Sequence, residues 1–286
     1  MNSIRYIQHK PFLAYFTGLL ESRDYTNEIK ALEVGCGPGH FSALLKDQLK
    51  DRIDITAIDP SQEDIQTCAS HHAAVKYRAT TILDMDPERY REHFDVILFS
   101  KSLHHCDPLD ETVEQAHRFL KKGGILVAEE FNPDAIDEPT ARFFFNRLDL
   151  LRIGNHILQP AIKSESFLAR WEQMIDPKSG PPVERWASIF NRKAATNLFK
   201  HGLQGHHMSS HGAMITSLAK AFGSGDESVV KAARNQPFLQ CNFVLFGLED
   251  TPIGEAVVEA IIAQEASAIK DGVINGTGVS YLVEKQ

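Results

Sequence analysis

The chain has 286 residues, of which 43% are hydrophobic and 24% charged, so it can bury a substantial core as one large domain or as a domain with an insertion. Its formal net charge of −8 argues against broad nucleic-acid binding, because such binding relies on Lys and Arg to neutralise phosphates. No stretch of about 18 apolar residues occurs, so no membrane-spanning helix is expected.

The cysteines and the N-terminus both indicate a cytoplasmic protein. The four cysteines lie far apart and form no C-x-x-C pair, which predicts reduced, mostly buried thiols; they are Cys36, Cys68, Cys106 and Cys241. The first ten residues, MNSIRYIQHK, contain no apolar core of a signal peptide.

The first predicted element is a helix from Tyr6 to Arg23, in which apolar residues recur at helical spacing. Pro11 is acceptable there because it falls in the first turn of the helix. The pattern favours a helix that packs on the edge of a sheet.

The stretch ALEVGCGPGHF, from Ala31 to Phe41, predicts a buried strand, a glycine turn and the start of a helix. Glycines are required where the backbone takes a positive φ or approaches a ligand closely. The amides that begin the following helix then face whatever is bound in front of them.

The spacing of these glycines narrows the class of ligand. They follow G-x-G-x-G, whereas dinucleotide folds use G-x-G-x-x-G, and no Lys-Ser/Thr pair follows as a phosphate-binding P-loop requires. An acid, Glu33, stands two residues before the first glycine. An acid at this position suits a cationic ligand better than a pyrophosphate.

The stretch Ala31–Phe41 resembles the first motif of the class I S-adenosylmethionine-dependent methyltransferases, and three later segments match this family in order and spacing. Ile53–Asp59 resembles their second strand, Phe94–Ser100 their fourth strand, and Leu120–Glu130 the turn and fifth strand that follow. The resemblance covers roughly residues 30–131. It implies an α/β fold: a Rossmann-like, doubly wound, mostly parallel seven-stranded sheet with an antiparallel last strand and a helical lid insertion.

The resemblance also implies S-adenosyl-L-methionine as the cofactor. The glycines would shape the floor under its methionine part, and Glu33 would orient the loop or the amino group of the cofactor. Asp59 would accept hydrogen bonds from both ribose hydroxyls, although an acid there also suits the cap of a helix from Ser61. The contacts expected outside the adenine pocket are Glu33, Gly35, Cys36, Gly37, Gly39, Asp59, Pro60 and Ser100.

Adenine recognition departs from the family pattern. The family usually has Gly-Asp where this chain has Thr80-Thr81. Thr81 would then offer a hydroxyl acceptor and Ile82 a backbone amide, or Asp84 would take over the role of the missing acid. Asp84 is equally consistent with a simple turn before Pro87.

The acceptor site is expected around the SLHH turn. The strand Phe94–Ser100 delivers this turn to the carboxyl edge of the sheet, where open α/β folds bind ligands. His105 is the first candidate for a catalytic base or substrate contact, and His104 is the second. Alternatively, either ring is exposed to solvent or packs in the core. In the resembled family an N-terminal helix often closes over the cofactor, so Tyr6, His9 or Tyr15 would reach the methionine end of the cofactor. The expected substrate contacts are Tyr15, Lys101 and Leu103.

Beyond Phe131 the family pattern ends. Helices are predicted from Ala141, over Ile162–Met174, over Glu184–Lys200 and over Pro252–Lys270, with a turn and a short terminal strand or tail after the last. Phe238–Leu248 is predicted to be the antiparallel last strand of the sheet. The three histidines of Gly205–Gly212 have no flanking Cys or acid, so no metal is expected.

Five segments follow from these elements: an N-terminal helical cap (1–29), an S-adenosylmethionine-binding core (30–132), a helical lid insertion (133–184), the rest of the core with antiparallel strands (185–250), and a C-terminal helix and tail (251–286). The expected activity is methyl transfer from S-adenosylmethionine to O, N or C of a small molecule of secondary metabolism, without nucleic-acid or membrane partners. The alternatives are a protein or RNA methyltransferase, and a protein that binds the cofactor for another reaction or for regulation.

Overall fold

The computed structural model describes residues 3–68, 72–158, 160, 165–190 and 209–286. The chain divides into two compact units, each assembled from three segments. The sheet unit comprises Phe12–Glu130, Ser209–Ala233 and Val279–Gln286, and the helical unit comprises Met1–Pro11, Phe131–Met208 and Arg234–Gly278. The five segments expected from the sequence stay a prediction.

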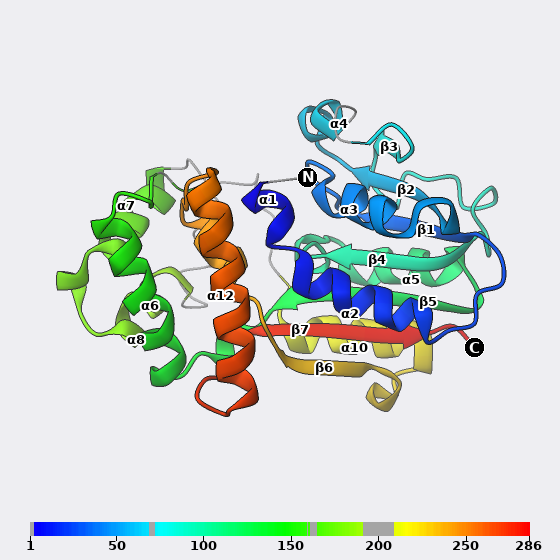
Figure 1. Cartoon of the computed structure of the whole chain (residues 1–286). Coiled ribbons are helices and arrows are strands. Elements are labelled where there is room, and N and C mark those ends of the chain that lie inside the picture. The colour runs from blue at the N-terminus through cyan, green and yellow to red at the C-terminus, as the bar shows by residue number, and fades with distance from the viewer. Residues whose placement is uncertain (1–2, 69–71, 159, 161–164, 191–208) are drawn as a thin grey trace. The chain divides into compact units, whose positions relative to one another are not determined.

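The described residues form a seven-stranded sheet in the order β3-β2-β1-β4-β5-β7-β6 (Figure 1). Its strands are β1 (Ile29–Val34), β2 (Ile53–Asp59), β3 (Lys76–Ala79), β4 (Phe94–Ser100), β5 (Leu120–Phe131), β6 (Lys231–Gln236) and β7 (Gly278–Glu284). The pairs among β1 to β5 are all parallel. The strand order reverses between β1 and β4, which is where open α/β sheets bind ligands. The predicted doubly wound, Rossmann-like fold is confirmed.

The antiparallel strand of this sheet is β7. The amide of Gly123, near the start of β5, donates to the carbonyl of Lys285 at 2.8 Å, just past the end of β7. The amide of Asn132, just past the end of β5, donates to the carbonyl of Thr277 at 2.6 Å, just before β7. The two strands therefore run in opposite directions, as their arrows in Figure 1 show.

The prediction of a strand over Phe238–Leu248 is wrong, because Leu239–Leu245 form helix α11. Its buried apolar side chains recur at the helical spacing of four and three residues, at Leu239, Phe243 and Phe246. The carboxylate of Glu265 accepts the backbone amides of Phe238 and Leu239 at 2.9 and 3.1 Å, amides that the start of a helix leaves unpaired. Burial raises the pKa of Glu265 to about 7 in spite of these bonds. A short apolar run cannot by itself distinguish a buried strand from a buried helix.

Successive residues of β1 and of β4 pack into two different cores, one on each face of the sheet. In β1, Ala31 belongs to one core and Leu32 to the other; in β4, Val96 and Ile97 divide in the same way. This alternation of period two places apolar side chains of these central strands on both faces of the sheet.

Helices cover both faces of the sheet unit. The helices are α2 (Lys10–Glu21, within the unit from Phe12), α3 (His40–Leu49), α4 (Gln62–Cys68), α5 (Leu109–Phe119) and α10 (His211–Gly223). Side chains of α2 and α3 share the core that contains Ala31, and those of α5 and α10 share the core that contains Leu32. Figure 1 shows α2 on one side of the strands, with α5 and α10 on the other. The sequence predicted one helix over Tyr6–Arg23 on the edge of the sheet; the structure has α1 (Ile4–Ile7) and α2 there, and α2 packs on a face of the sheet.

The helical unit has its own apolar core. Its helices are α1 (Ile4–Ile7), α6 (Glu138–Ile153), α7 (Glu165–Ile175), α8 (Pro182–Phe190), α11 and α12 (Pro252–Lys270). The indole of Trp171 donates to the carbonyl of Phe246 at 2.9 Å, which ties α7 to the end of α11. The predicted helix Glu184–Lys200 overlaps α8, and its end lies outside the described residues. A lid role for residues 133–184 stays a prediction.

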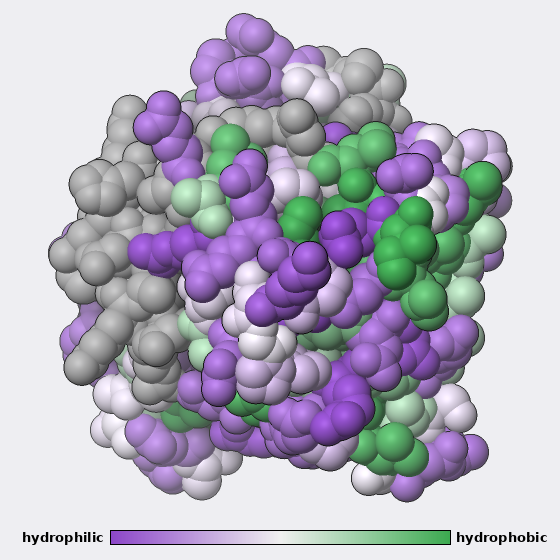
Figure 2. Space-filling model, turned by 90° about the vertical axis from the view of Figure 1, so that its left-hand side faces the viewer, coloured by the Kyte–Doolittle hydropathy of each residue, from purple (hydrophilic) through white to green (hydrophobic). Residues whose placement is uncertain are grey.

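Apolar side chains are exposed in the helical unit among polar ones. Leu150, Ile153 and Leu158 are exposed by 70%, 70% and 58%. On the face in Figure 2, separate green apolar areas alternate with purple hydrophilic ones. Among the residues that the structure describes, no helix combines the length and the apolar character needed to cross a membrane.

Two helical glycines give opposite expectations for stability. A Cβ on Gly254, in the first turn of α12, would lie 1.8 Å from the carbonyl oxygen of Glu249, so Gly254→Ala should cost about 3 kcal/mol of unfolding free energy because a backbone segment must move. A Cβ on Gly18, exposed on α2, would meet no atom within 4 Å. Gly18→Ala should therefore stabilise the chain by up to about 1 kcal/mol, since alanine favours the helix.

Urea unfolding of the two variants and the wild type checks this expectation. A midpoint that falls in Gly254→Ala and holds or rises in Gly18→Ala is the expected pattern. Equal midpoints for all three proteins would contradict the close approach of Glu249 to α12.

Candidate functional site

The ends of four parallel strands meet at one edge of the sheet and carry most of the residues that the sequence singled out. Val34 pairs with Ile58 at the ends of β1 and β2, and Ser100 pairs with Glu129 near the ends of β4 and β5. The loop after β1 turns toward β2, because the amide of Gly35 donates to the carbonyl of Ile58 at 2.8 Å. This carboxyl edge is the candidate site.

The glycine loop needs each of its three glycines. Gly35, Gly37 and Gly39 have φ angles of 72°, 48° and 76°, a region that favours glycine. A Cβ on Gly35 would lie 2.5 Å from Cβ of Ser102, and one on Gly39 would lie 2.7 Å from the ring of Tyr77. A Cβ on Gly37 would meet nothing within 4 Å. Packing therefore requires the outer two glycines, while the middle one leaves room for a ligand to approach the backbone.

Asp59 ends β2 and holds the glycine loop. Its Oδ2 accepts the amide of Gly37 at 2.9 Å, and its Oδ1 accepts the amide of Ser61 at 2.8 Å. The bond to Ser61 lies before α4, whose first turn is capped by Ser61 itself: its hydroxyl accepts the amide of Asp64 at 3.2 Å, so Asp59 is not the cap of this helix. Burial raises the pKa of Asp59, and the two amide bonds act against this shift. A carboxylate has about four lone-pair sites, so both oxygens retain capacity for ligand hydroxyls.

The residues considered for adenine recognition form one hydrogen-bonded turn. The hydroxyl of Thr81 donates to the carboxylate of Asp84 at 2.6 Å and accepts the amide of Asp84 at 3.3 Å. The side chain of Ile82 is buried in the core. The two alternatives of the sequence, Thr81 and Asp84, thus lie side by side as one polar group.

Two buried acids lie near the lysine that follows β4. Burial raises the pKa of Glu33 to about 8 and that of Glu129 to about 7, and the positive charge of Lys101 acts against both shifts. The hydroxyl of Ser42 donates to Glu33, and the hydroxyl of Ser100 donates to Glu129 at 3.0 Å. A further cationic group at this edge would favour the ionised form of both acids, which suits a positively charged ligand.

His104 and Glu130 form an imidazole–carboxylate pair. Nδ1 of His104 contacts Oε2 of Glu130 at 2.5 Å, and the backbone amide of His104 donates to Oε1 at 3.3 Å. The side chain of Glu130 is 1% exposed and that of His104 is 15% exposed. In the neutral ring whose Nδ1–H donates to this carboxylate, Nε2 carries the lone pair and is the atom that can accept a proton from another group.

The histidine turn lies against the glycine loop. The hydroxyl of Ser102 donates to the carbonyl of Val34, the last residue of β1, at 2.5 Å. The rings of His104 and His105 have centroids 3.9 Å apart, so the two histidines contact one another. The candidate base and the candidate cofactor loop are thereby held at the same edge.

The other residues predicted from the sequence differ in burial and in their contacts. Tyr15 is half-buried on α2, and its ring stacks on Phe12 with centroids 6.2 Å apart. Pro60 is exposed directly after Asp59. Leu103 is completely buried in the core, so its side chain offers no surface to an acceptor and we leave it out of the proposed site. Of the three histidines in Gly205–Gly212, His211 contacts the Tyr281 hydroxyl, and 205–208 lie outside the described residues.

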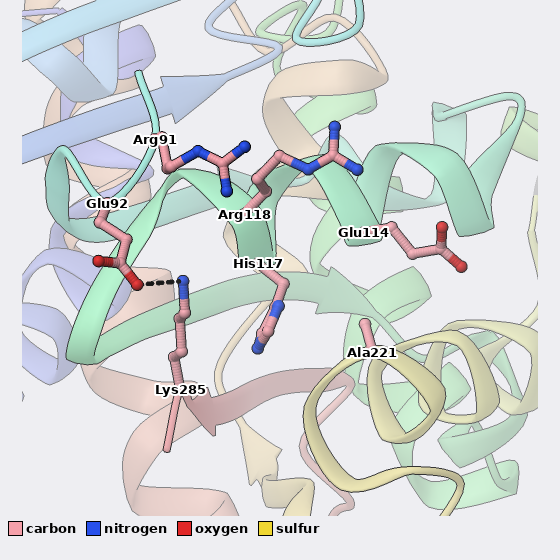
Figure 3. Close-up of a pocket in the computed structure, with 7 residues that line it drawn as sticks. All are labelled: Arg91, Glu92, Glu114, His117, Arg118, Ala221 and Lys285. Carbon is pink, nitrogen blue, oxygen red and sulfur yellow. Dashed lines mark ion pairs between the residues drawn. The ribbon is translucent and has the colours of Figure 1, made fainter. Parts of the chain in front are cut away.

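A cavity of about 330 Å³ lies away from this edge, beside the starts of β4 and β5 (Figure 3). The side chain of Lys285 donates to the carbonyl of Leu120 at 2.8 Å and pairs with Glu92 at 3.4 Å. The cavity is lined by basic and acidic side chains and one alanine: Arg91, Glu92, Glu114, His117, Arg118, Lys285 and Ala221. We place the site at the carboxyl edge, where the glycine loop and the buried acids meet.

Three contributors were missed from the sequence. Glu130 orients His104, Tyr77 packs against Gly39 and donates its hydroxyl to the Gly39 carbonyl at 3.2 Å, and Glu129 joins Glu33 near Lys101. The acids had a signal, since two adjacent carboxylates end a strand whose carboxyl edge carries the site. Tyr77 had none, because strand alternation does not identify which ring reaches a loop.

Comparison with known proteins agrees with this geometry. A family model described as a methyltransferase domain matches residues 9–203. The chain is 30% identical over 108 residues to a ubiquinone biosynthesis O-methyltransferase of Bradyrhizobium sp. (strain ORS 278), covering 36% of this chain and 40% of that protein. It is 30% identical over 122 residues to a malonyl-[acyl-carrier protein] O-methyltransferase of Paenibacillus sp. (strain JDR-2), covering 41% and 44%. The chain thus spans about two fifths of these curated relatives.

Solved structures share the fold over a greater length. The geranyl diphosphate C-methyltransferase of Streptomyces coelicolor A3(2), solved with Mg²⁺, geranyl diphosphate and S-adenosyl-L-homocysteine, superposes with a TM-score of 0.52 at 13% identity. The match covers 97% of this chain and 80% of that one. At this identity the likeness concerns the fold alone.

Proposed function

The chain belongs to the class I S-adenosylmethionine-dependent methyltransferases, and from this premise we propose that it transfers a methyl group from S-adenosylmethionine to a small molecule. The acceptor atom we favour is one that must lose a proton, such as a hydroxyl oxygen or an acidic carbon. The observation that carries this choice is the His104–Glu130 pair, held against the glycine loop at the carboxyl edge.

The residues at this edge fit the cofactor. The open side of Gly37 lets a ligand lie against the loop backbone, and Asp59 retains acceptor capacity on both oxygens for two ribose hydroxyls. The buried Glu33 and Glu129 suit the positive charges of the methionine end. Thr81 and Asp84 supply acceptors for the adenine amino group, with the Ile82 amide beside them.

When bound, the cofactor supplies an electrophilic methyl group on a sulfonium that is a good leaving group. The chain then has two tasks: to align the acceptor with that methyl group and to exclude water. Asp59 and the glycine loop would fix the position of the cofactor. Lys101, which follows β4, and Tyr15, on α2, remain the proposed acceptor contacts.

His104 would take the acceptor proton on Nε2. Glu130 holds the Nδ1–H and the backbone amide of His104, so it orients the ring and stabilises the imidazolium that forms. Glu130 is therefore a positioning residue, while His104 is the proposed catalytic base. Because of this pair we propose His104 as the base, in place of His105, which the sequence favoured.

Release of S-adenosylhomocysteine in the presence of an acceptor panel tests the proposal. The panel contains catechols, phenols, 1,3-dicarbonyls and a malonyl thioester, with peptides and transfer RNA as the rival classes. We expect release with at least one acceptor that carries an acidic hydroxyl or carbon, and none with peptides or RNA. Binding without release in any mixture would favour a cofactor-binding protein, and release with peptide or RNA alone would favour the macromolecular rival.

A further inference from the structure

Two cysteines that are distant in the sequence meet beneath the glycine loop. Cys36 lies inside the loop, and Cys68 is the last residue of α4. Their sulfurs contact the same atom: Sγ of Cys36 lies 3.5 Å and Sγ of Cys68 lies 3.2 Å from the carbonyl oxygen of Gly37. Both thiols donate toward this one carbonyl oxygen, so the two sulfurs lie close together. Cys68 is fully buried and Cys36 is 8% exposed, so the pair lies directly under the surface of the loop.

Interaction between the two thiols lowers the pKa of Cys68, whereas the same interaction and burial raise the pKa of Cys36. When two thiols meet in this way, one sulfur can attack an oxidant and the other can resolve the product to a disulfide.

We propose that Cys36 and Cys68 form a reversible disulfide in the presence of a peroxide, and that this bond weakens cofactor binding. The second half rests on the proposed function, because it assumes that the glycine loop binds S-adenosylmethionine. The first half rests only on the meeting of the two sulfurs at the Gly37 carbonyl.

The chemistry balances with hydrogen peroxide as the oxidant. The thiolate of one cysteine attacks one peroxide oxygen, the O–O bond breaks, and a sulfenic acid forms as hydroxide leaves. The thiol of the other cysteine then attacks the sulfenic sulfur; its proton and the sulfenic hydroxyl leave together as water, and the S–S bond forms. Two electrons pass from the two sulfurs to the peroxide, and a dithiol reductant reverses the change.

Bond formation would move the loop. A disulfide brings its sulfurs to about 2 Å, closer than any hydrogen-bonded pair of thiols, so Cys36 must shift toward α4. The Gly37 carbonyl loses both thiol contacts, and the neighbouring Gly37 amide is the one that Asp59 holds at 2.9 Å. We expect the oxidised chain to bind S-adenosylmethionine at least about tenfold more weakly, since loop and carboxylate no longer align.

The test uses the full chain with Cys106→Ser and Cys241→Ser, so that Cys36 and Cys68 are the remaining thiols. After peroxide treatment, intact mass should fall by two hydrogen atoms, peptide mapping should find Cys36 linked to Cys68, and dithiothreitol should reverse both changes. The matched control adds Cys68→Ser and should show no such loss. Retention of both thiols, or oxidation to sulfinic acid without a link, would overturn the proposal.

Calorimetric titration of the reduced and oxidised forms with S-adenosylmethionine tests separately whether the disulfide weakens cofactor binding. A tenfold loss of affinity that dithiothreitol restores is expected, and equal affinity would overturn the regulatory half. If neither form binds S-adenosylmethionine while the link still forms, the proposed function fails and the disulfide stands. The mass readout therefore distinguishes the two failures.

Discussion

Asp59→Ala is expected to weaken the binding of S-adenosylmethionine by about 100-fold or more. Each hydrogen bond from a ribose hydroxyl to a carboxylate is worth about 1.5–3 kcal/mol, and the variant loses two of them. It also removes the acceptor that holds the Gly37 amide, so the loop loses its anchor. Calorimetric titration of wild type and variant measures the change.

Two further variants define what the loss means. Glu63→Ala removes an exposed acid from the first turn of the neighbouring helix α4 and should leave the affinity unchanged. Asp59→Asn keeps the shape of the side chain without its charge, so its affinity for S-adenosylmethionine should lie between those of the wild type and Asp59→Ala. An Asp59→Ala chain that remains folded and binds as wild type does would remove Asp59 from the cofactor site.

His104→Ala should lower the rate of methyl transfer by about 100- to 10,000-fold, the usual contribution of general base catalysis. Glu130→Gln should also lower kcat and change the pH profile of the reaction, because a neutral amide no longer stabilises the imidazolium. Neither change should alter the affinity for S-adenosylmethionine by more than a small factor. The measurement is S-adenosylhomocysteine release with an acceptor that the panel identifies.

A histidine outside the site provides the control. His117 lines the cavity at the opposite edge of the sheet, so His117→Ala should keep full activity (Figure 3). If His105→Ala abolishes transfer while His104→Ala does not, the base is His105, and the role of Glu130 is structural.

The parallel half of the fold was readable because its signals are local. A glycine loop between a buried strand and a helix, and acids or polar residues directly after buried strands, place β1, β2 and β4 in order. The remaining strands carry weaker signals. The sequence predicts only a short strand or tail where β7 (Gly278–Glu284) lies, and it predicts the antiparallel strand at the apolar run Phe238–Leu248, which forms α11.

That error has a physical origin in tertiary contacts. The carboxylate that caps the start of α11 belongs to Glu265, some 26 residues away in the sequence. Local pattern cannot contain a cap from another helix, and the apolar run is compatible with either structure until the cap is known. Long-range pairing of this kind limits what periodicity can predict.

In the candidate site, too, residues with local sequence signals could be predicted, whereas a partner from another strand could not. Gly35, Gly37, Gly39 and Asp59 could be named from spacing and strand ends, and the structure brings them together. The partner of His104 could not be named, because Glu130 lies on another strand and meets the histidine only through the pairing of β4 with β5.

The most direct test of the central claim is calorimetric titration of the wild-type chain with S-adenosylmethionine and S-adenosylhomocysteine, with NAD⁺ and ATP as controls. We expect micromolar binding of the two adenosyl ligands at one site per chain, and no heat from NAD⁺ or ATP. Failure of both adenosyl ligands to bind, or tighter binding of NAD⁺ or ATP, would contradict a methyl-donor site at the carboxyl edge of this sheet.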